Sequence, residues 1–356
     1  MTTLNPAMLI IARESRRLTQ KALAQASGTT QGTVSKAEAG LLAPSSDVIN
    51  AWAHALRYNP SFLGRQPDAP ALPQTFFRKK KKLSATEVKT IRATAAVRCM
   101  QLEVLVRAAD PPENNLRALR IGKDVENAAE AARYMRSVWR VPAGPLSDLT
   151  QLLEDNGVIV IAMPRNDNDL SGVSIYDHRS TLPPVVFSNA SAPGCRSRFT
   201  LAHELGHLVL HHHLREAEAI DECEEEADEF AAEFLLPAAD IRREFPYRID
   251  LSQLVHLKPR WGVSMGALLM RARSLGRITE YQHSVMWRKM SMLGYRTNEP
   301  VEVPREVPHI LDDMVEIHLR DLDFKDEELS DALGLELDEF LATYRPAAQR
   351  GLRLVR

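Results

Sequence analysis

Residues 199 to 211 read Phe-Thr-Leu-Ala-His-Glu-Leu-Gly-His-Leu-Val-Leu-His, and this stretch decides the fold at the centre of the chain. Its polar positions are set among apolar residues without a proline, so the pattern predicts a mostly buried α-helix. Residues four apart share one face of a helix, so His203 and His207 are expected to direct two imidazoles at one metal ion. From the next position, the carboxylate of Glu204 can reach a metal-bound water without being a ligand. Burying such groups without a metal is costly, so the stretch predicts a zinc hydrolase site with Glu204 as its base.

The third zinc ligand is expected in a second helical segment, which runs from Asp221 to Pro237. A catalytic zinc usually takes three protein ligands and leaves its fourth position for water. Glu224 and Asp228 are one helical turn apart near the apolar face of this segment. Glu224 is therefore the predicted ligand, and Asp228 is predicted to accept the free ring N–H of a liganding histidine. The alternative ligands in the same run are Cys223, Glu225 and Glu226.

A rival third ligand is His213, ten residues after His203, which is the spacing of the metzincins. That pattern needs a glycine seven residues after the first histidine, so that the chain can turn back. Leu210 occupies this position and allows the helix to continue through His211. The run from His211 to His213 is therefore interpreted mainly as a cluster at the end of the helix.

Length and composition indicate a globular protein with room for two or three domains, with 356 residues and 44% hydrophobic content. No apolar run approaches the roughly 20 residues of a membrane span, and the first 17 residues lack the pattern of a signal peptide. We therefore expect a cytoplasmic protein without a membrane partner. The three cysteines are far apart, which excludes a disulfide scaffold or an iron–sulfur cluster.

The net charge of −2 is unevenly distributed. Residues 1 to 82 contain twelve Lys or Arg and four acids, a balance of +8, so the remaining chain carries −10. Such asymmetry is typical of a nucleic-acid-binding piece joined to another function.

The basic part is predicted to be an all-α bundle that contains a helix-turn-helix, with a glycine turn at Gly28. In this arrangement the second helix enters the DNA major groove, while Val34 and Ala37 point back to the bundle. The predicted helices lie near Met8–Ala12 and at Gln20–Ala26, Gln31–Glu38 and Ser46–Leu56. The residues predicted to contact base edges and phosphates are Gln20, Gln31, Thr33, Ser35 and Lys36.

The motif Leu-Thr-Gln-x-x-Leu-Ala, then Gly, then Val-Ser-x-x-Glu-x-Gly resembles the lambda-repressor-like (XRE) helix-turn-helix family over about residues 5 to 64. This resemblance implies binding to a double-stranded DNA operator, and we expect a homodimer that grips two half-sites. It also implies that Glu38 is a scaffold acid. Gly32 departs from the longer polar residue often found at the start of the recognition helix, which leaves the base preference open.

Residues 65 to 84 are predicted to be a linker, because three prolines interrupt any helix there. The linker ends in five consecutive cations, among which Arg78, Lys79 and Lys80 are predicted to lie along DNA phosphates. The predicted domains are the DNA-binding bundle at 1–64, this linker, a metallopeptidase domain at 85–300 and a helical extension at 301–356.

The central part is predicted to be α+β, because its periodicity changes from helical to strand-like. Helices are expected at 84–106, 125–141 and 146–156, with Tyr134 and Trp139 as core residues. The resulting sheet would lie beside the helix that carries His203, and its edge can pair with an extended substrate. Strands are expected at Val158–Ala162, Gly172–Tyr176 and Pro184–Ser188.

Three further motifs resemble the ImmA/IrrE family of zinc metallopeptidases over roughly residues 125 to 300. They are Arg-x-Arg-Phe-Thr-Leu-Ala-His-Glu-Leu-Gly-His-Leu from Arg196, Glu-x-x-Ala-Asp-x-Phe-Ala-Ala-x-x-Leu-Leu-Pro from Glu224, and Leu-Lys-x-x-Trp-Gly-Val-Ser from Leu257. The resemblance implies a zincin-like fold, the zinc ligands His203, His207 and Glu224, and Glu204 as base. Asp228 stands where the family usually has Asn, and either residue can orient a ligand.

The sequence thus predicts a DNA-binding regulator with a zinc endopeptidase that cleaves a repressor, a toxin or another partner regulator. The resemblance suggests a role in stress or mobile-element control. The alternative is a non-proteolytic repressor or antitoxin-like factor whose peptidase-like domain is a sensor or docking module. Weaker candidates for stabilising an oxyanion are Arg198, His256 and Tyr281. In the extension, helices are expected at 308–321 and 326–344, as a packing appendage or, alternatively, for dimerisation.

Overall fold

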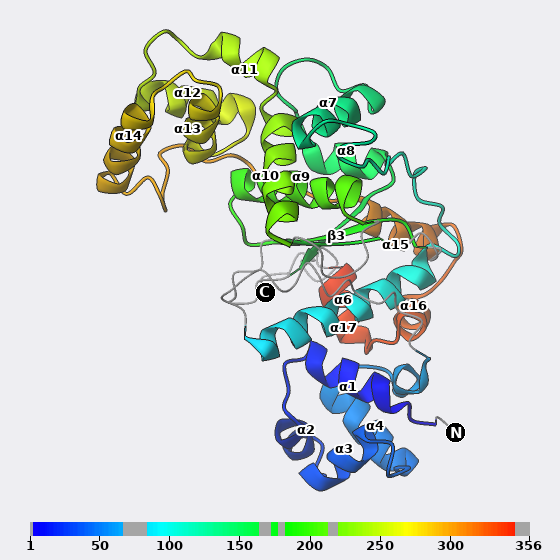
Figure 1. The fold of residues 1–356 in the computed structure, drawn as a ribbon. Coiled ribbons are helices and arrows are strands. Elements are labelled where there is room, and N and C mark those ends of the chain that lie inside the picture. Colours follow the sequence, from blue (N-terminus) through cyan, green and yellow to red (C-terminus); the bar gives the residue numbers. More distant parts are fainter. Residues whose placement is uncertain (1–2, 67–83, 164–171, 177–181, 213–219, 346–356) are drawn as a thin grey trace, which may run out of the picture.

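A small mixed β-sheet lies between the two halves of the molecule (Figure 1). Its strands follow the order β1-β3-β2, with β1 parallel and β2 antiparallel to β3. Phe187 on β3 pairs with Ile161 on one side and Val173 on the other. The strands are β1 (Ile159–Met163), β2 (Gly172–Ile175) and β3 (Val185–Asn189), so all three predicted strands are confirmed to within one residue. The computed structural model describes residues 3–66, 84–163, 172–176, 182–212 and 220–345.

Both faces of the sheet are buried, because successive side chains of a strand point to opposite sides. On one face, Val160 and Val186 join the hydrophobic cluster of the helices that carry the predicted metal ligands. On the other face, Ile161 and Phe187 join a second cluster. The helices on the first face are α7 (Ala128–Val138), α8 (Leu149–Asp155), α9 (Gly194–Leu210) and α10 (Ile220–Leu235).

A group of four helices extends from the end of α10 and lies at the upper left of Figure 1. The buried Arg271 ties this group to α10, because its guanidinium donates to the Leu236 carbonyl at 2.9 Å and pairs with the buried Glu233. The four helices are α11 (Ala238–Glu244), α12 (Leu251–Trp261), α13 (Met265–Ser274) and α14 (Glu280–Met292).

The N-terminal bundle contains the predicted helix-turn-helix. The Thr19 and Thr30 side chains accept hydrogen bonds from backbone N–H groups in the first turns of the two helices, which satisfies donors that have no partner within the helix. Gly28 has φ +67°, a left-handed conformation that glycine adopts without strain. The elements are α1 (Pro6–Ser15), α2 (Gln20–Ala26), α3 (Gln31–Glu38), α4 (Ser46–Leu56) and the 3-10 helix η1 (Pro60–Gly64), so the predicted bundle is confirmed.

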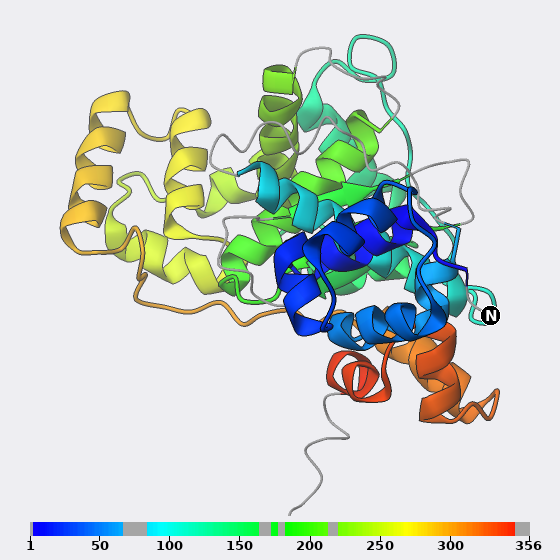
Figure 2. The same cartoon turned by 90° about the horizontal axis from the view of Figure 1, so that it is seen from below.

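A middle layer of four helices joins this bundle to the sheet (Figures 1 and 2). One hydrophobic cluster runs from the bundle through this layer to the lower sheet face, and it includes Leu9, Trp52, Met314 and Phe340. The C-terminal segment therefore packs against the DNA-binding bundle as well as against the sheet. The helices are α6 (Ala85–Leu105), α15 (Ile310–Arg320), α16 (Asp326–Leu333) and α17 (Leu337–Tyr344).

Two expectations about helices and core residues are wrong. The segment 326–344 is not one helix but two, because Gly334 ends α16 with φ +76°. A Cβ at Gly334 would lie 2.6 Å from the Phe62 ring, so this position also allows close contact with the bundle. Tyr134 is 45% exposed and lies outside the core, whereas Trp139 is buried as predicted.

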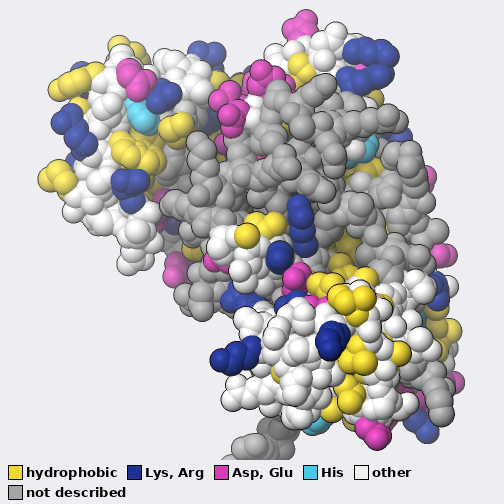
Figure 3. Space-filling view, turned by 60° about the horizontal axis from the view of Figure 1, so that its bottom comes forward, with side chains coloured by type: hydrophobic (Ala, Val, Ile, Leu, Met, Phe, Trp, Pro, Cys, Tyr) yellow, Lys and Arg dark blue, Asp and Glu magenta, His cyan; other side chains and the backbone are white. Residues whose placement is uncertain are grey.

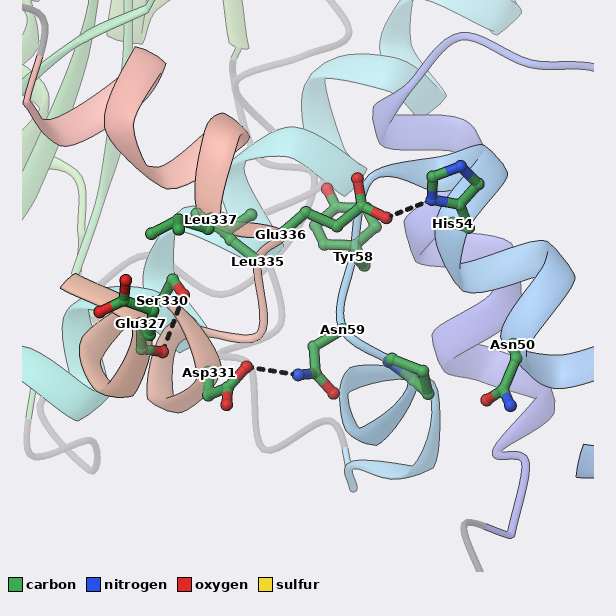
Figure 4. A pocket seen from close by; sticks show the side chains of 11 residues that line it. Asn50, His54, Tyr58, Asn59, Glu327, Ser330, Asp331, Leu335, Glu336 and Leu337 are labelled. Carbon is green, nitrogen blue, oxygen red and sulfur yellow. Dashed lines mark hydrogen bonds and ion pairs between the residues drawn. The ribbon is translucent and has the colours of Figure 1, made fainter. Parts of the chain in front are cut away.

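Polar contacts reinforce the joint between the bundle and α16–α17, where an open cleft of about 360 Å³ lies (Figure 4). The backbone N–H of Asn59 donates to the Gly334 carbonyl at 2.9 Å, and the Asn59 side chain donates to Asp331 at 2.6 Å. His54 Nδ1 lies 2.7 Å from a carboxylate oxygen of Glu336. These bonds and the shared core hold the N-terminal bundle against α16 and α17.

Within the described ranges, no helix combines the length and the apolar character needed to cross a lipid bilayer.

Because the bundle and the C-terminal segment share one core, we expect a core substitution in the C-terminal segment to destabilise the N-terminal bundle. Phe340 is fully buried, so Phe340→Ala is expected to cost about 3–5 kcal/mol in the free energy of unfolding. Amide hydrogen exchange in α1 and α4 should accelerate as well. The control is Phe324→Ala, because Phe324 is 38% exposed and should cost much less. Unchanged exchange in α1 and α4 for a destabilised Phe340→Ala protein would show that the bundle folds independently of the C-terminal segment.

Candidate metal centre and DNA-binding surface

Three predicted metal ligands meet at one point between α9 and α10. The Nε2 atoms of His203 and His207 are 3.0 Å apart, and Glu224 carboxylate oxygens lie 3.9 Å and 3.4 Å from these two atoms. Two imidazole nitrogens and one carboxylate oxygen form a donor set that catalytic zinc uses. Tetrahedral zinc with bonds of about 2.0–2.2 Å separates its donors by roughly 3.3 Å, so the observed spacing fits a single ion.

The packing of α9 on α10 produces this convergence. His203 and His207 are one helical turn apart on α9 and face α10, where Glu224 lies. Gly206 lies between the two helices, and a Cβ there would lie 3.2 Å from the Ala227 backbone. A larger residue at this position would press on α10, so the glycine allows the close approach that the ligand set requires.

Asp228 forms a hydrogen bond with the first histidine. Its carboxylate lies 2.8 Å from His203 Nδ1, so the ring donates from Nδ1 and leaves the Nε2 lone pair toward the other ligands. Burial lowers the pKa of His203, but the hydrogen bond to Asp228 and the charges of Glu204, Asp228 and Glu224 raise it to a net value above normal. A proton therefore competes with a metal ion for this ring, and metal binding displaces that proton.

Glu204, the predicted base, is 6% exposed and is held by strand β2. The Ser174 hydroxyl donates to Glu204 Oε2 at 2.7 Å, which holds the carboxylate in one orientation. A Cβ at Gly172 would lie 2.5 Å from Thr200 and 3.0 Å from Glu204, so only glycine fits there without displacement. Ser174 and Gly172 were missed by sequence reasoning, although a glycine in a strand often marks a close approach.

The alternative ligands lie elsewhere. Glu225 is exposed, Cys223 is buried and Glu226 contacts His211. Among the described residues, the group that could hold a metal ion consists of His203, His207 and Glu224. His213 lies outside the described residues.

The weaker oxyanion candidates are not gathered at this centre. The buried Arg198 pairs with Glu306 and donates to the carbonyls of Leu146 and Ser147, at 2.9 Å and 3.3 Å, so its contacts are structural. His256 lies exposed on α12, and Tyr281 is 75% exposed on α14.

The recognition helix α3 places its polar side chains as predicted. Gln31 and Lys36 are exposed, Thr33 and Ser35 are partly exposed, and Val34 and Ala37 are buried. Figure 3 brings this end of the molecule forward, and the described Lys and Arg side chains on this face lie apart from one another. Arg78, Lys79 and Lys80 lie outside the described residues.

Gln20 and Gln31 belong to a hydrogen-bonded chain that ends in the bundle. The Gln31 side-chain amide donates to Gln20 Oε1 at 2.9 Å, and the Gln20 side-chain amide donates to Glu38 at 2.7 Å. Glu38 is paired with Arg13 at 2.5 Å, which fits its expected role as a scaffold acid. The chain fixes the amide orientation of both glutamines before any contact with DNA.

Comparison with known protein families identifies two domains. Residues 153–273 match the IrrE N-terminal-like domain, and residues 9–63 match the helix-turn-helix family. The first match includes α9, α10 and all three residues of the candidate metal centre. None of the curated proteins compared with the chain matches it.

The geometry predicts that Glu224 is the third ligand. Glu224→Gln removes an anionic metal ligand while keeping the side-chain size. Loss of a residue that only hydrogen-bonds a metal ligand typically lowers metal affinity by roughly 10–100-fold, so the affinity of this variant for zinc should fall by more than that. Zinc per protein chain after dialysis and competition with a chelator would measure this. Glu225→Gln is the matched control and should bind zinc like the wild type, because Glu225 is exposed. Loss of zinc from the Glu225 variant alone would contradict the assignment.

Proposed function

Because this chain joins a helix-turn-helix DNA-binding domain to an IrrE N-terminal-like peptidase domain, we propose that it is a transcriptional regulator with zinc-dependent endopeptidase activity. The observation that carries the proposal is the cluster of His203, His207 and Glu224 beside the buried, hydrogen-bonded Glu204. A metal site with a purely structural role is closed by protein ligands and needs no neighbouring base. Here three candidate ligands and one neighbouring carboxylate that is not a ligand match the requirements of hydrolysis.

The proposed mechanism assigns a separate role to each side chain. A zinc ion bound by the three ligands would supply a water of lowered pKa and polarise the peptide carbonyl. Glu204 takes the proton of the attacking water and passes it to the leaving amine nitrogen. Ser174 holds the Glu204 carboxylate in one orientation, and Asp228 holds the His203 ring. No side chain is assigned to the oxyanion, because Arg198 is occupied by Glu306.

The DNA-binding half acts through the exposed face of α3. Arginine, lysine and polar side chains on such a helix contact phosphates and base edges, and a homodimer reads two half-sites. The protein substrate proposed from the family resemblance is a repressor, a toxin or another partner regulator in stress or mobile-element control. The proposed DNA contacts are Gln20, Gln31, Thr33, Ser35 and Lys36, with Arg78, Lys79 and Lys80 on phosphates.

The second candidate function is regulation without proteolysis, with the peptidase-like domain as a sensor or docking module. The burial of Glu204, at 6% exposed, and of His207, at 3%, favours it. A polypeptide has to reach these side chains before it can be cleaved, and an enclosed base restricts that access.

The two candidates are separated by Glu204→Gln. This variant should keep zinc and DNA binding but lose proteolysis by about 10²–10⁴-fold, because general base catalysis contributes that much. New protein N-termini would be counted by mass spectrometry in cells that produce either the wild type or the variant. Glu225→Gln, with its exposed side chain, is the control and should cleave normally. An identical set of N-termini for wild type and Glu204→Gln would favour regulation without proteolysis.

The DNA contact of Lys36 gives a separate prediction. If this exposed ammonium binds a phosphate, Lys36→Gln weakens binding to all sequences and lowers the slope of log affinity against log salt by about one per lost contact. Fluorescence anisotropy with a labelled duplex at several salt concentrations measures both quantities. Lys289→Gln, at an exposed position on α14, serves as the charge-matched control. An unchanged slope for Lys36→Gln would remove this residue from the interface.

A further inference from the structure

A second chain of hydrogen bonds begins at the ligand His207 and leads away from the metal centre. His207 Nδ1 lies 2.9 Å from His211 Nδ1, and His211 Nε2 lies 2.9 Å from a carboxylate oxygen of Glu226. His211 follows the last residue of α9, one turn after His207, and Glu226 lies on α10 two residues after Glu224. His211 is 3% exposed. A buried histidine thus connects a ligand on one helix to a carboxylate on the other.

The direction of each bond follows from the chemistry of imidazole. A metal ion at His207 Nε2 needs the lone pair of that nitrogen, so the ring proton is on Nδ1. His207 Nδ1 is then a donor, and His211 Nδ1 must be the acceptor. A neutral ring that accepts at Nδ1 carries its proton on Nε2, and this N–H points to Glu226. Each group in the chain therefore has only one arrangement that satisfies its neighbour.

We infer that His211 and Glu226 are positioning residues for His207, an inference that rests on the metal binding in the proposed function. Glu226 selects the tautomer of His211, and His211 then selects the tautomer and ring rotation of His207. The Nε2 lone pair of His207 is thereby directed at the ion. Partners of this kind are typical of histidines that bind metals, but here a second histidine stands between the ligand and the carboxylate.

The geometry distinguishes His211 from a ligand. Its contact is with His207 Nδ1, whereas the nitrogen that faces His203 and Glu224 is His207 Nε2. The three consecutive acids on α10 therefore have different environments. Glu224 faces the metal centre, Glu225 is exposed, and Glu226 holds His211. His203 needs no such intermediary, because Asp228 contacts its Nδ1 directly.

The tautomers can be observed directly by ¹⁵N NMR of histidine side chains in the zinc-loaded protein. We expect His207 to be protonated at Nδ1 and His211 to be neutral and protonated at Nε2. A doubly protonated His211, or one protonated at Nδ1, would overturn the inference, because neither form can accept the His207 proton. This measurement does not depend on proteolysis.

Measurements of zinc affinity test whether the hydrogen bonds from His207 through His211 to Glu226 strengthen metal binding by His207. His211→Leu removes the acceptor at similar volume and should weaken zinc binding by about 10–100-fold. His211→Asn should restore most of the affinity, because its amide oxygen can accept the His207 proton in place of Nδ1. Thermal unfolding of the metal-free variants checks that each is folded, and Glu226→Leu provides a second variant if His211→Leu does not fold.

A double-mutant comparison shows whether Glu226 acts through the tautomer of His211 or only through its packing. Glu226→Leu should weaken zinc binding in the wild-type background but not in the His211→Asn background, where no tautomer remains to be selected. The exposed neighbour supplies the control, since Glu225→Leu should change nothing in either background. Equal losses from Glu226→Leu in both backgrounds would overturn the inference. If the wild type binds zinc and His211→Leu binds it as tightly, this inference fails while the proposed function stands. A wild-type protein without zinc affinity would refute both.

Discussion

The close contact of α9 with α10 is the constraint on which the candidate metal centre depends. The two histidines come from one helix and the carboxylate from the other, so their separation is set by the distance between the helix axes. Gly206 sets that distance, because any Cβ at this position would meet the backbone of Ala227. The Phe230 ring packs against the same glycine and stacks on Phe234, which lies one turn further along α10. The close apolar packing of the two helices thereby sets the distance between the two histidines on α9 and Glu224 on α10.

A second set of contacts connects α9 to the C-terminal segment. Arg198 on α9 pairs with Glu306, whose carboxylate also accepts the backbone N–H groups of Leu149 and Thr150 at the start of α8. In return, Glu154 on α8 accepts N–H groups at the start of α15, at 2.9 Å from His309. Burial raises the pKa of Glu154 to about 7, although these N–H groups favour its charge. Each helix is thus capped by a carboxylate from the other segment. Because α15 to α17 share their core with the N-terminal bundle, the Arg198–Glu306 pair and this core together connect α9 with the helix-turn-helix domain.

The sequence was most informative where local rules decide the structure. Caps at Thr19 and Thr30, the turn at Gly28 and the change of period after residue 157 were sufficient to predict the bundle and the strands. The histidine pair followed from helical spacing alone. Gly334 also carried a local signal, a glycine at the end of a helix, which the interpretation as one helix overlooked.

The contacts that the sequence did not reveal are long-range. Ser174 reaches Glu204 across 30 positions, and Arg16 reaches Glu339 across 323, so no periodicity in one segment can indicate either pair. Tyr134 shows that a large side chain is not by itself a sign of a core position, because such a side chain can lie on the exposed face of an amphipathic helix. The acidic run on α10 was ambiguous for the same reason. Its three adjacent carboxylates differ only in helical angle, and the position of α9 decides which of them meets the histidines.

The negative charge gathered at the candidate metal centre favours the binding of a cation. Glu204, Glu224 and Asp228 bring three carboxylates to two largely buried imidazoles, and desolvation makes uncompensated charge costly. Burial alone would lower the pKa of His203, but the hydrogen bond to Asp228 and the nearby carboxylates raise it above its ordinary value. A divalent ion held by His203, His207 and Glu224 would bring two positive charges to the same carboxylates. The hydrogen bonds that His203 and His207 donate to Asp228 and His211 involve the Nδ1 atoms and leave both Nε2 atoms facing the position that an ion would take. Both Nε2 atoms can therefore serve one ion without a change of hydrogen-bond partner at either Nδ1 atom.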